Sequence, residues 1–187
     1  MTESVSNVIE EAAGNDVLSR VYTTCATKIG TIFLCVEEGA LVGAWLEKQK
    51  HFPEKERLGK FVEAHENSVL SQAVQELEEY FRGQRTVFEI PLRPEGTDFQ
   101  LAVWNLVSDI RYGYTDTYGA ISRVVGPGAP AQAVGQAVGR NPCIIFIPCH
   151  RVLGAGGKIT GYAGGLSAKQ WLLELERPQN LAGDRLF

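Results

Sequence analysis

The spacing of hydrophobic residues changes near residues 91–96, and this change constrains the fold more than any other feature of the chain. Before it, residues 20–26, 30–36 and 40–46 are short runs rich in apolar and β-branched side chains, with brief turns between them. Such runs are typical of an antiparallel meander. After it, apolar residues recur every three or four positions, as they do in amphipathic helices. The pattern predicts an α+β protein with an N-terminal antiparallel sheet and a C-terminal helical domain.

The remaining segments of the N-terminal half set the expected boundaries. Residues 47–66 are charged and indicate a solvated connection. Helical spacing predicts a helix over 70–81, with Ser68 as its cap and Gly83 beyond its end. Residues 86–90 are expected to form another strand before a break rich in proline. The expected parts are a polar N-terminus (1–18), an N-terminal α/β domain (19–95), a C-terminal domain (96–178) and a short tail (179–187).

Two short helices in the second half are predicted to form a helix-turn-helix. Thr117 can cap a helix over 118–125, and residues 130–138 resume as a helix rich in small residues. The turn between them, at 126–128, contains glycine, as helix-turn-helix motifs often do. Capping boxes predict two further helices, one opened by Thr97 with Gln100 and one opened by Ser167 with Gln170.

Charge is distributed unevenly along the chain. The net charge of the 187 residues is −4, yet residues 117–173 contain five basic residues and no acidic one. The rest of the chain holds all 22 acidic residues against 13 basic ones. A region without acids that contains a helix-turn-helix suits a polyanion, and such binding should be local and sensitive to salt. Chance enrichment of a segment rich in Gly and Ala explains the charge equally well.

Simple patterns exclude several protein classes. No run approaches the roughly 20 apolar residues of a membrane span, and the acidic N-terminus lacks the basic-then-apolar order of a secretory signal. We therefore expect no membrane partner and a cytoplasmic location, or a nuclear one in a eukaryote. The four cysteines are too unevenly spaced for a disulfide framework, and with the three histidines they give no zinc-binding spacing. We expect no metal.

The segment Pro-Cys-His-Arg-Val, residues 148–152, is the part of the sequence that says most about a possible reaction. The apolar run 144–147 predicts a buried strand, which Pro148 ends because proline has no N–H to donate. Cys149 is then expected where the chain leaves that strand, directly followed by His150 and Arg151. A nearby imidazole or guanidinium lowers the pKa of a thiol and so favours the nucleophilic thiolate. A nucleophile beside a base is the general pattern of covalent catalysis.

Packing is the competing interpretation of Cys149. A lone cysteine after an apolar run is more often a core residue than a nucleophile, and composition alone modestly favours that role. Cys25, Cys35 and Cys143 lie in apolar or strand-like runs with no adjacent histidine or arginine. For those three cysteines packing is the expected role.

Residues 148–152 resemble the active-site motif of the O(6)-alkylguanine-DNA alkyltransferases, the methylated-DNA–protein-cysteine methyltransferases. The resemblance extends over residues 97–176, and more weakly over the preceding meander and helix. It implies a C-terminal domain that carries both the helix-turn-helix and the active cysteine. It also implies a protein without a cofactor that binds double-stranded DNA through the minor groove and flips an alkylated guanine into a pocket. The sequence does not indicate the oligomeric state, for which we expect a monomer. Further matching segments are 133–135, 141–142, 161–166 and 169–173, together with Glu176.

The same resemblance assigns catalytic roles. The alkyl group of O(6)-alkylguanine, with O(4)-alkylthymine as a second candidate lesion, would move irreversibly to Cys149, so that each molecule acts once. His150 would take the thiol proton through a water, and Glu176 would orient the imidazole. Tyr118 matches the tyrosine that supplies a proton to the departing guanine. Asn141 matches the residue that braces the active-site turn near the thiol.

Substrate and DNA contacts follow from the same motifs. Backbone groups of Val152 and Ala163 would read the base edge, and the glycine-rich loop with Tyr162 and Gly164 would approach the flipped base closely. Arg151 has a second interpretation, in which it ties the active-site turn to a neighbouring segment. The residues expected at the DNA surface are Arg123, Ala131, Gln132, Gly135, Arg140 and Arg151.

The sequence departs from the family at Gln132. The family usually has an arginine there, which fills the space that the flipped base leaves. Glutamine can wedge and hydrogen-bond, but it brings no charge and less stacking surface. We therefore expect lower DNA affinity or slower repair than in relatives with arginine, with Arg140 as a partial compensation. Ala163 stands where some relatives carry serine, a mild change because the contact there involves the backbone.

Three other functions stay open at this stage. A non-catalytic or weakly active alkyl-lesion-binding protein is compatible with Gln132, although the presence of Cys149 opposes it. A Cys/His hydrolase would turn over continuously, and no second catalytic motif supports it. A helix-turn-helix transcription regulator needs long polar side chains on its recognition helix, whereas residues 130–138 offer mainly Ala, Val and Gly. Small residues suit a shallow minor groove instead.

Overall fold

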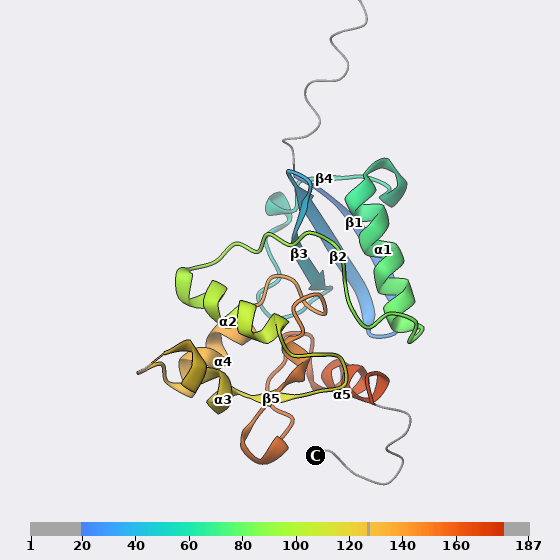
Figure 1. Ribbon diagram of the computed structural model, residues 1–187. Helices are drawn as coiled ribbons and strands as arrows, with labels where there is room; N and C mark the ends of the chain where they lie inside the picture. The colour runs from blue at the N-terminus through green and yellow to red at the C-terminus, as the bar shows by residue number, and fades with distance from the viewer. Residues whose placement is uncertain (1–19, 127, 178–187) are drawn as a thin grey trace, which may run out of the picture.

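The computed structural model describes residues 20–126 and 128–177 (Figure 1). The expected N-terminus (1–18), Pro127 of the predicted turn and the tail (179–187) lie outside the described residues. The strands are β1 (Val21–Thr27), β2 (Gly30–Glu37), β3 (Ala40–Leu46), β4 (Lys60–Phe61), β5 (Asp116–Thr117) and β6 (Val152–Leu153). The α-helices are α1 (Ser68–Phe81), α2 (Asp98–Ser108), α3 (Tyr118–Val125), α4 (Ala131–Gly139) and α5 (Leu166–Leu175).

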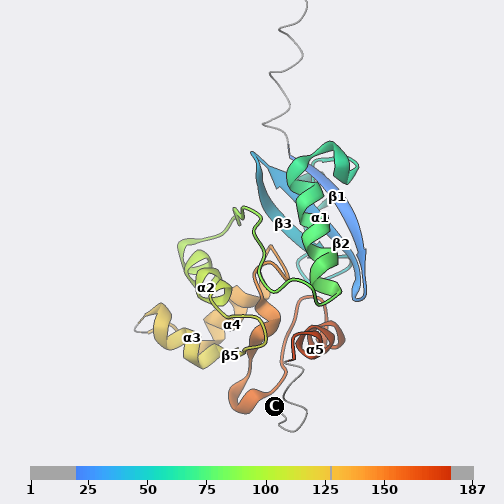
Figure 2. The ribbon, with the colours of Figure 1, turned by 45° about the vertical axis from the view of Figure 1, so that its right-hand side comes forward.

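The N-terminal half is a sheet with one helix packed on it, as the alternation of apolar runs predicts. The strand order is β3-β2-β1-β4, with β1, β2 and β3 antiparallel and the short β4 parallel to β1 at one edge. Helix α1 lies along one face of this sheet (Figure 2). Its buried face consists of Leu70, Ala73, Glu76, Leu77 and Tyr80. The predicted meander is therefore confirmed.

The ends of α1 and the connection before it differ in detail from the prediction. Asn67, and not Ser68, caps the helix, because its side chain accepts hydrogen bonds from the N–H groups of Val69 and Leu70 at 3.0 and 3.1 Å. Gly83 lies beyond the end with φ +70°, as predicted. The charged connection is not wholly solvated. It contains β4 and two 3₁₀ turns, and Leu58 is buried within it.

Residues 86–90 do not form the expected strand. The N–H of Glu89 donates instead to the buried carboxylate of Glu76 at 2.9 Å, so this backbone is held by a side chain of α1. The chain then meets the edge of β3 at one point, where Leu41 donates to the carbonyl of Pro91 at 2.8 Å. Pro91 has no N–H to extend a ladder. A single bridge between Leu41 and Leu92 is all that forms.

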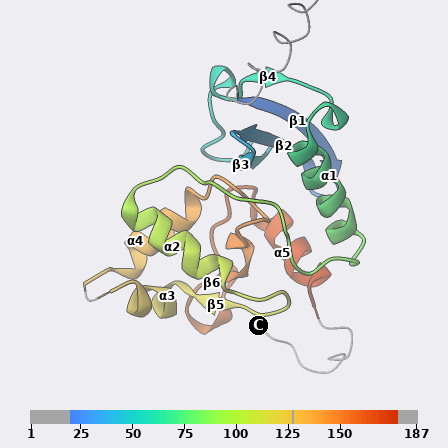
Figure 3. The same cartoon turned by 45° about the horizontal axis from the view of Figure 1, so that its top comes forward.

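The helices of the second half confirm most of the capping signals. Thr97 and Gln100 form the predicted capping box of α2, and Thr117 caps α3 by accepting from the N–H of Ala120 at 3.1 Å. Helices α3 and α4 pack against each other and against α2, as a helix-turn-helix requires (Figure 3). The predicted last helix forms as α5, but the capping box predicted for it, Ser167 with Gln170, does not. That helix begins after Gly165, whose φ is +89°, and no side chain caps it.

The apolar run 144–147 is a buried turn and not a strand. Asn141 causes this, because its side chain ties the two ends of the run together. Its amide nitrogen donates to the carbonyl of Ile147 at 2.8 Å, and its oxygen accepts from the N–H of Cys143 at 2.9 Å. Ile145 is forced to a φ of +72° within the turn, a conformation that is unusual for a β-branched residue.

This turn joins the two halves of the molecule. Ala44 of β3 donates to the carbonyl of Pro142 at 2.8 Å and accepts from the N–H of Ile144 at 3.0 Å. One hydrophobic cluster runs from the sheet and α1 through this turn to α2, α4 and α5. The hydrophobic contacts therefore cross the expected boundary at 95/96, and the segment that carries Cys149 rests directly on the edge of the sheet.

Gly43 offers a test of how tightly β3 is packed. The ring of Trp45 folds over Gly43 so closely that an added Cβ would lie 1.8 Å from a ring carbon. We expect Gly43→Ala to lower the free energy of unfolding by about 1–3 kcal/mol, because the buried ring must move. Gly119→Ala in α3 is the matched control, since only one side-chain atom lies within 4 Å of its added Cβ. Chemical denaturation of both variants measures the difference. Equal stabilities would contradict the prediction.

Candidate active site

A cavity of about 930 Å³ lies between the helix-turn-helix, the loop that follows β6 and the loop that follows β3. Cys149 forms part of its wall, together with Tyr118 at the start of α3 and Tyr162. This cavity brings together ten of the residues that the sequence predicts to act in catalysis, substrate binding or DNA binding. They are Tyr118, Arg123, Ala131, Gln132, Gly135, Arg140, Cys149, Tyr162 and Ala163, with Asn141 bonded just behind the thiol.

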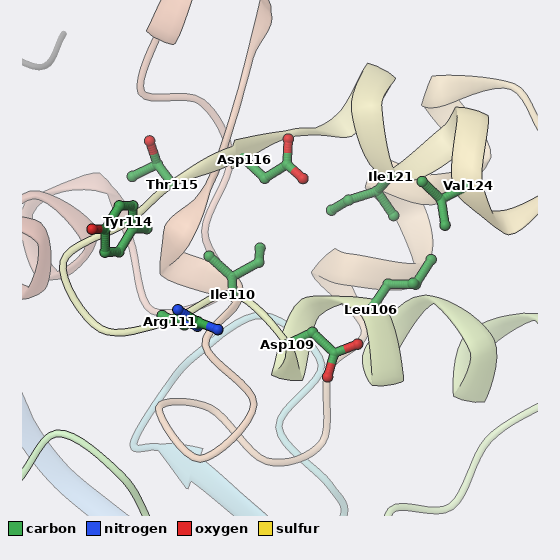
Figure 4. Close-up of a pocket in the computed structure, with 9 residues that line it drawn as sticks. All are labelled: Leu106, Asp109, Ile110, Arg111, Tyr114, Thr115, Asp116, Ile121 and Val124. Atoms are coloured by element: carbon green, nitrogen blue, oxygen red, sulfur yellow. The ribbon is translucent and has the colours of Figure 1, made fainter.

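A second hollow, of about 480 Å³, is lined by α2, α3 and the segment between α2 and β5. Figure 4 shows Leu106, Ile121 and Val124 on one side of it, and Arg111, Tyr114 and Asp116 on the other. Its lining contains no cysteine or histidine. The chemistry that the sequence predicts therefore belongs to the cavity at Cys149.

Cys149 is positioned by the turn before it and begins a short 3₁₀ helix, Cys149–Arg151. Its N–H donates to the carbonyl of Ile147 at 2.8 Å, and Asn141 holds that same carbonyl from the other side. The residue is 3% exposed. The expectation that Cys149 follows a buried strand is thus corrected, since it follows a buried turn that two side-chain hydrogen bonds fix.

The thiol is not ionised in the resting protein, contrary to the sequence-based expectation. Burial raises the pKa of Cys149 to about 11, although a hydrogen bond from Asn141 and the charge of Lys169 oppose that rise. The neighbours in sequence do not lower the pKa as expected, because the side chains of His150 and Arg151 bind Glu176 instead. A base must therefore remove the proton when the thiol reacts.

His150 is suited to be that base. Its Nε2 lies 2.7 Å from Oε1 of Glu176, and its Nδ1 is buried with no hydrogen-bond partner among the described residues. Burial lowers the pKa of His150, even though Glu176 opposes the shift. A neutral imidazole that donates from Nε2 to the carboxylate keeps a lone pair on Nδ1. The side chain can therefore accept one proton, and Glu176 then stabilises the imidazolium.

Arg151 also binds the carboxylate of Glu176. Its Nε and Nη2 donate to the two carboxylate oxygens at 2.8 and 2.9 Å, and its Nη1 donates to the carbonyl of Ile110. Arg151, held in this bidentate arrangement, is buried, with 5% of the residue exposed. The prediction that Arg151 contacts DNA is therefore wrong. Its alternative role, tying the active-site turn to a neighbouring segment, agrees with these bonds.

The carboxylate of Glu176 is held in its charged form. Burial alone would raise its pKa, but the hydrogen bonds and charges of His150 and Arg151 lower it to about 2. Tyr80 of α1 adds a hydrogen bond to Oε1 at 2.6 Å. Sequence reasoning missed Tyr80, which lies 96 residues before Glu176 in the chain. Its helical spacing with Leu77 signals only a core position.

Lys169 is the second residue whose position the sequence did not predict. Its ammonium group is buried and donates to the carbonyls of Val152, Thr160 and Gly161 at 2.6, 2.8 and 3.3 Å. Burial lowers its pKa to about 8. The available signal in the sequence was the position of this lysine in its helix, next to Ala168 and three residues before Leu172, which are both apolar and buried. The carbonyl of Val152, expected to read the base edge, already accepts one hydrogen bond from Lys169.

The remaining predicted substrate residues separate into two groups. Tyr118 lines the cavity as a protonated phenol, because burial raises its pKa. The hydroxyl of Tyr162 is buried with no hydrogen-bond partner among the described residues, and Ala163 lies beside it on the cavity wall. Gly164 does not line the cavity. It packs against Leu46 instead, so close that an added Cβ would lie 2.9 Å from Cδ2 of that side chain.

The chain matches two family models over consecutive segments. The model of the ribonuclease-like domain of 6-O-methylguanine DNA methyltransferase matches residues 20–94. The model of the DNA-binding domain of the same protein family matches residues 98–178. Together the two matches cover most of the chain. The chain belongs to the 6-O-methylguanine DNA methyltransferase family.

Relatives of this methyltransferase family match over nearly the whole chain. A methylated-DNA–protein-cysteine methyltransferase of Mycobacterium tuberculosis is 39% identical over 166 residues, which are 89% of this chain and 98% of the relative. The constitutive Bacillus subtilis enzyme of that name is 40% identical, over 83% of this chain and 94% of its own. A crystal structure of M. tuberculosis O6-methylguanine methyltransferase matches with a TM-score of 0.76 and 40% identity, over 88% of this chain and 96% of that one. A crystal structure of M. tuberculosis OGT in complex with DNA matches with a TM-score of 0.73 and 40% identity, over 86% of this chain and 97% of that one.

Within residues 20–126 and 128–177, histidine, cysteine and acidic side chains do not gather in any group of three or more that could hold a metal ion. No helix in that part of the chain has the length and apolar character needed to cross a membrane.

The buried carboxylate predicts a specific loss of stability in acid. The pKa of Glu176 is about 2 in the folded protein against an ordinary 4.5, so its contribution is present above pH 4.5 and is lost as the pH falls toward 2. The shift corresponds to roughly 3 kcal/mol. We expect the free energy of unfolding of the parent to fall more steeply over this range than that of Glu176→Gln, as measured by urea denaturation. Parallel pH profiles would contradict the assignment.

Proposed function

We propose that the protein repairs DNA by transferring the alkyl group of O(6)-alkylguanine to Sγ of Cys149, once per molecule. The observation that carries this proposal is a thiol in the cavity wall that is followed directly in the chain by His150, whose buried imidazole is bonded to Glu176 through Nε2 and leaves Nδ1 unbonded among the described residues. Family membership and the names of relatives that are 39–51% identical support the same reaction. O(4)-alkylthymine is a second candidate lesion.

The proposed step is a displacement at the alkyl carbon. Nδ1 of His150 takes the thiol proton, relayed by a water, and the resulting imidazolium is stabilised by Glu176. The sulfur forms a bond to the alkyl carbon while the bond from that carbon to O6 breaks, and its electron pair stays on the guanine. Tyr118 donates a proton to the departing base and recovers one from the imidazolium. The thiol proton thus ends on guanine, and Cys149 ends as a thioether.

Burial suits a thiol that reacts only once. A pKa of about 11 keeps Cys149 protonated, so stray electrophiles meet a weak nucleophile until a base is engaged. The product thioether has no charge to desolvate within the cavity. A thioether is also not hydrolysed as a thioester would be, which separates this proposal from a Cys/His hydrolase.

Duplex DNA is the proposed partner, bound through its minor groove by α4. The exposed residues of this helix are Ala131, Gln132 and Gln136, and Arg123 and Arg140 line the cavity beside it. The cavity of about 930 Å³ is large enough for an extruded base. A flipped guanine would enter between Tyr118 and Tyr162. We further propose that the protein acts as a monomer without cofactor, in the compartment that holds DNA (the cytoplasm in a bacterium).

The transfer is tested by intact mass. We expect incubation with a duplex containing O6-methylguanine to add the mass of one CH₂ group per molecule, mapped to Cys149. Cys149→Ser should show no gain, and Cys25→Ser, a change at another buried thiol, should gain it as the parent does. His150→Ala should slow the gain by about 10²–10⁴-fold, because general-base catalysis is lost. Binding without a mass change would support the non-catalytic alternative, and continuous turnover would support a hydrolase.

Gln132 is proposed to limit base extrusion. We expect Gln132→Arg to raise the transfer rate from duplex DNA by several-fold, because arginine adds charge and stacking surface where the base leaves the helix. The rate with the free base O6-benzylguanine should not change, since nothing has to be extruded. Gln136→Arg, one turn further along α4, is the matched control. No gain for Gln132→Arg in duplex repair would contradict the role.

A further inference from the structure

The N-terminal half contributes two side chains to the wall of the active-site cavity. Lys50 and His51 lie in the loop that follows β3, and both line the cavity with Cys149 and Tyr118. Both residues are exposed. The mechanism proposed above does not use them, and neither belongs to a motif that the sequence analysis identified.

Hydrogen bonds hold the backbone of this loop beside the cavity. Gln49 is buried, and its side-chain oxygen accepts from the N–H of Leu46 at 2.8 Å. The N–H of Lys50 donates to the carbonyl of Ala163 at 3.1 Å. Leu46 packs against Gly164 at the same junction. The loop after β3 and the active-site loop are therefore joined into one rim that presents Lys50 and His51.

The charged side chains that line the cavity are all basic. They are Lys50, Arg123 and Arg140, and the lining also includes His51 but no aspartate or glutamate. The chain as a whole carries a net charge of −4, so the absence of acids from this lining is not a reflection of composition. Basic groups around a concave surface focus a positive potential and attract anions. The guanine base that enters the cavity is neutral, so the anion must be another part of the DNA.

We propose that Lys50 and His51 form a binding site for the backbone phosphates next to the extruded nucleotide. This inference rests on the proposed function and extends the DNA-binding surface from the helix-turn-helix to the N-terminal sheet. An extruded base draws its flanking backbone toward the cavity rim, where exposed cationic side chains can bind phosphate. The site supplies, from a different element, part of the positive charge that Gln132 does not provide.

The experiment uses the full chain with Lys50 and His51 both changed to alanine. Alanine keeps the N–H of residue 50 that holds Ala163, so the rim should stay folded. We expect the dissociation constant for an O6-methylguanine duplex to rise roughly tenfold at low salt, with the slope of log Kd against log salt reduced by about 1, because one cation is removed. Lys60→Ala is the control, because it removes an exposed cation from β4, away from the cavity. It should leave both quantities near the parent values.

Transfer from the free base O6-benzylguanine separates this inference from the proposed function. We expect the double variant to react with it at the parental rate, since that substrate has no phosphate, and Lys50→Arg with His51 intact to bind duplex DNA as the parent does. An unchanged salt slope would overturn the phosphate site, and so would an equal loss of free-base reaction, which would show that the loop shapes the pocket. If the parent transfers from neither substrate, the proposed function itself fails.

Discussion

The buried carboxylate of Glu176 organises the site, and most of the structure around it serves to keep that charge satisfied. Its two oxygens receive hydrogen bonds from His150, Arg151 and Tyr80, which lie on two distant parts of the chain. A buried carboxylate without such partners would cost several kcal/mol or become protonated. Folding of α1, α5 and the active-site turn is therefore coupled through one group, and the same group fixes the imidazole.

This arrangement explains how a site can be stable and still reactive. Arg151 and Glu176 neutralise each other. Arg151, two residues after Cys149 in the sequence, therefore does not lower the pKa of the thiol. The thiol stays protonated in an apolar setting, and the imidazole stays neutral with one nitrogen uncommitted. In the mechanism that we propose, reactivity depends on a proton transfer that occurs when substrate fills the cavity, and not on a thiolate that is present beforehand. The strained turn at Ile145, held by Asn141, places the sulfur for that step.

The N-terminal sheet and the loop after it also make direct hydrogen bonds to the segments that form the active site. The edge of β3 pairs with the active-site turn through Ala44, and the loop after β3 holds Ala163 on the cavity rim. A sheet edge left open is prone to pair with other chains. Here it is covered in part by the segment that carries the catalytic cysteine, so that closure of the edge and positioning of the sulfur are achieved together.

The sequence by itself determined the elements whose causes are local. The meander, the capping box of α2 and the cap of α3 follow from spacing, because their partners lie within a few residues. The motif at residues 148–152 identified Cys149 as the candidate nucleophile only through its resemblance to a known family, since composition alone favoured packing. Tertiary structure decided what depends on distant partners. It turned the run 144–147 into a loop through Asn141, directed Arg151 inward to Glu176, and brought Tyr80 and Lys169 to the site. No local pattern contains these outcomes, because each is set by which buried polar group a side chain meets once the two halves have packed.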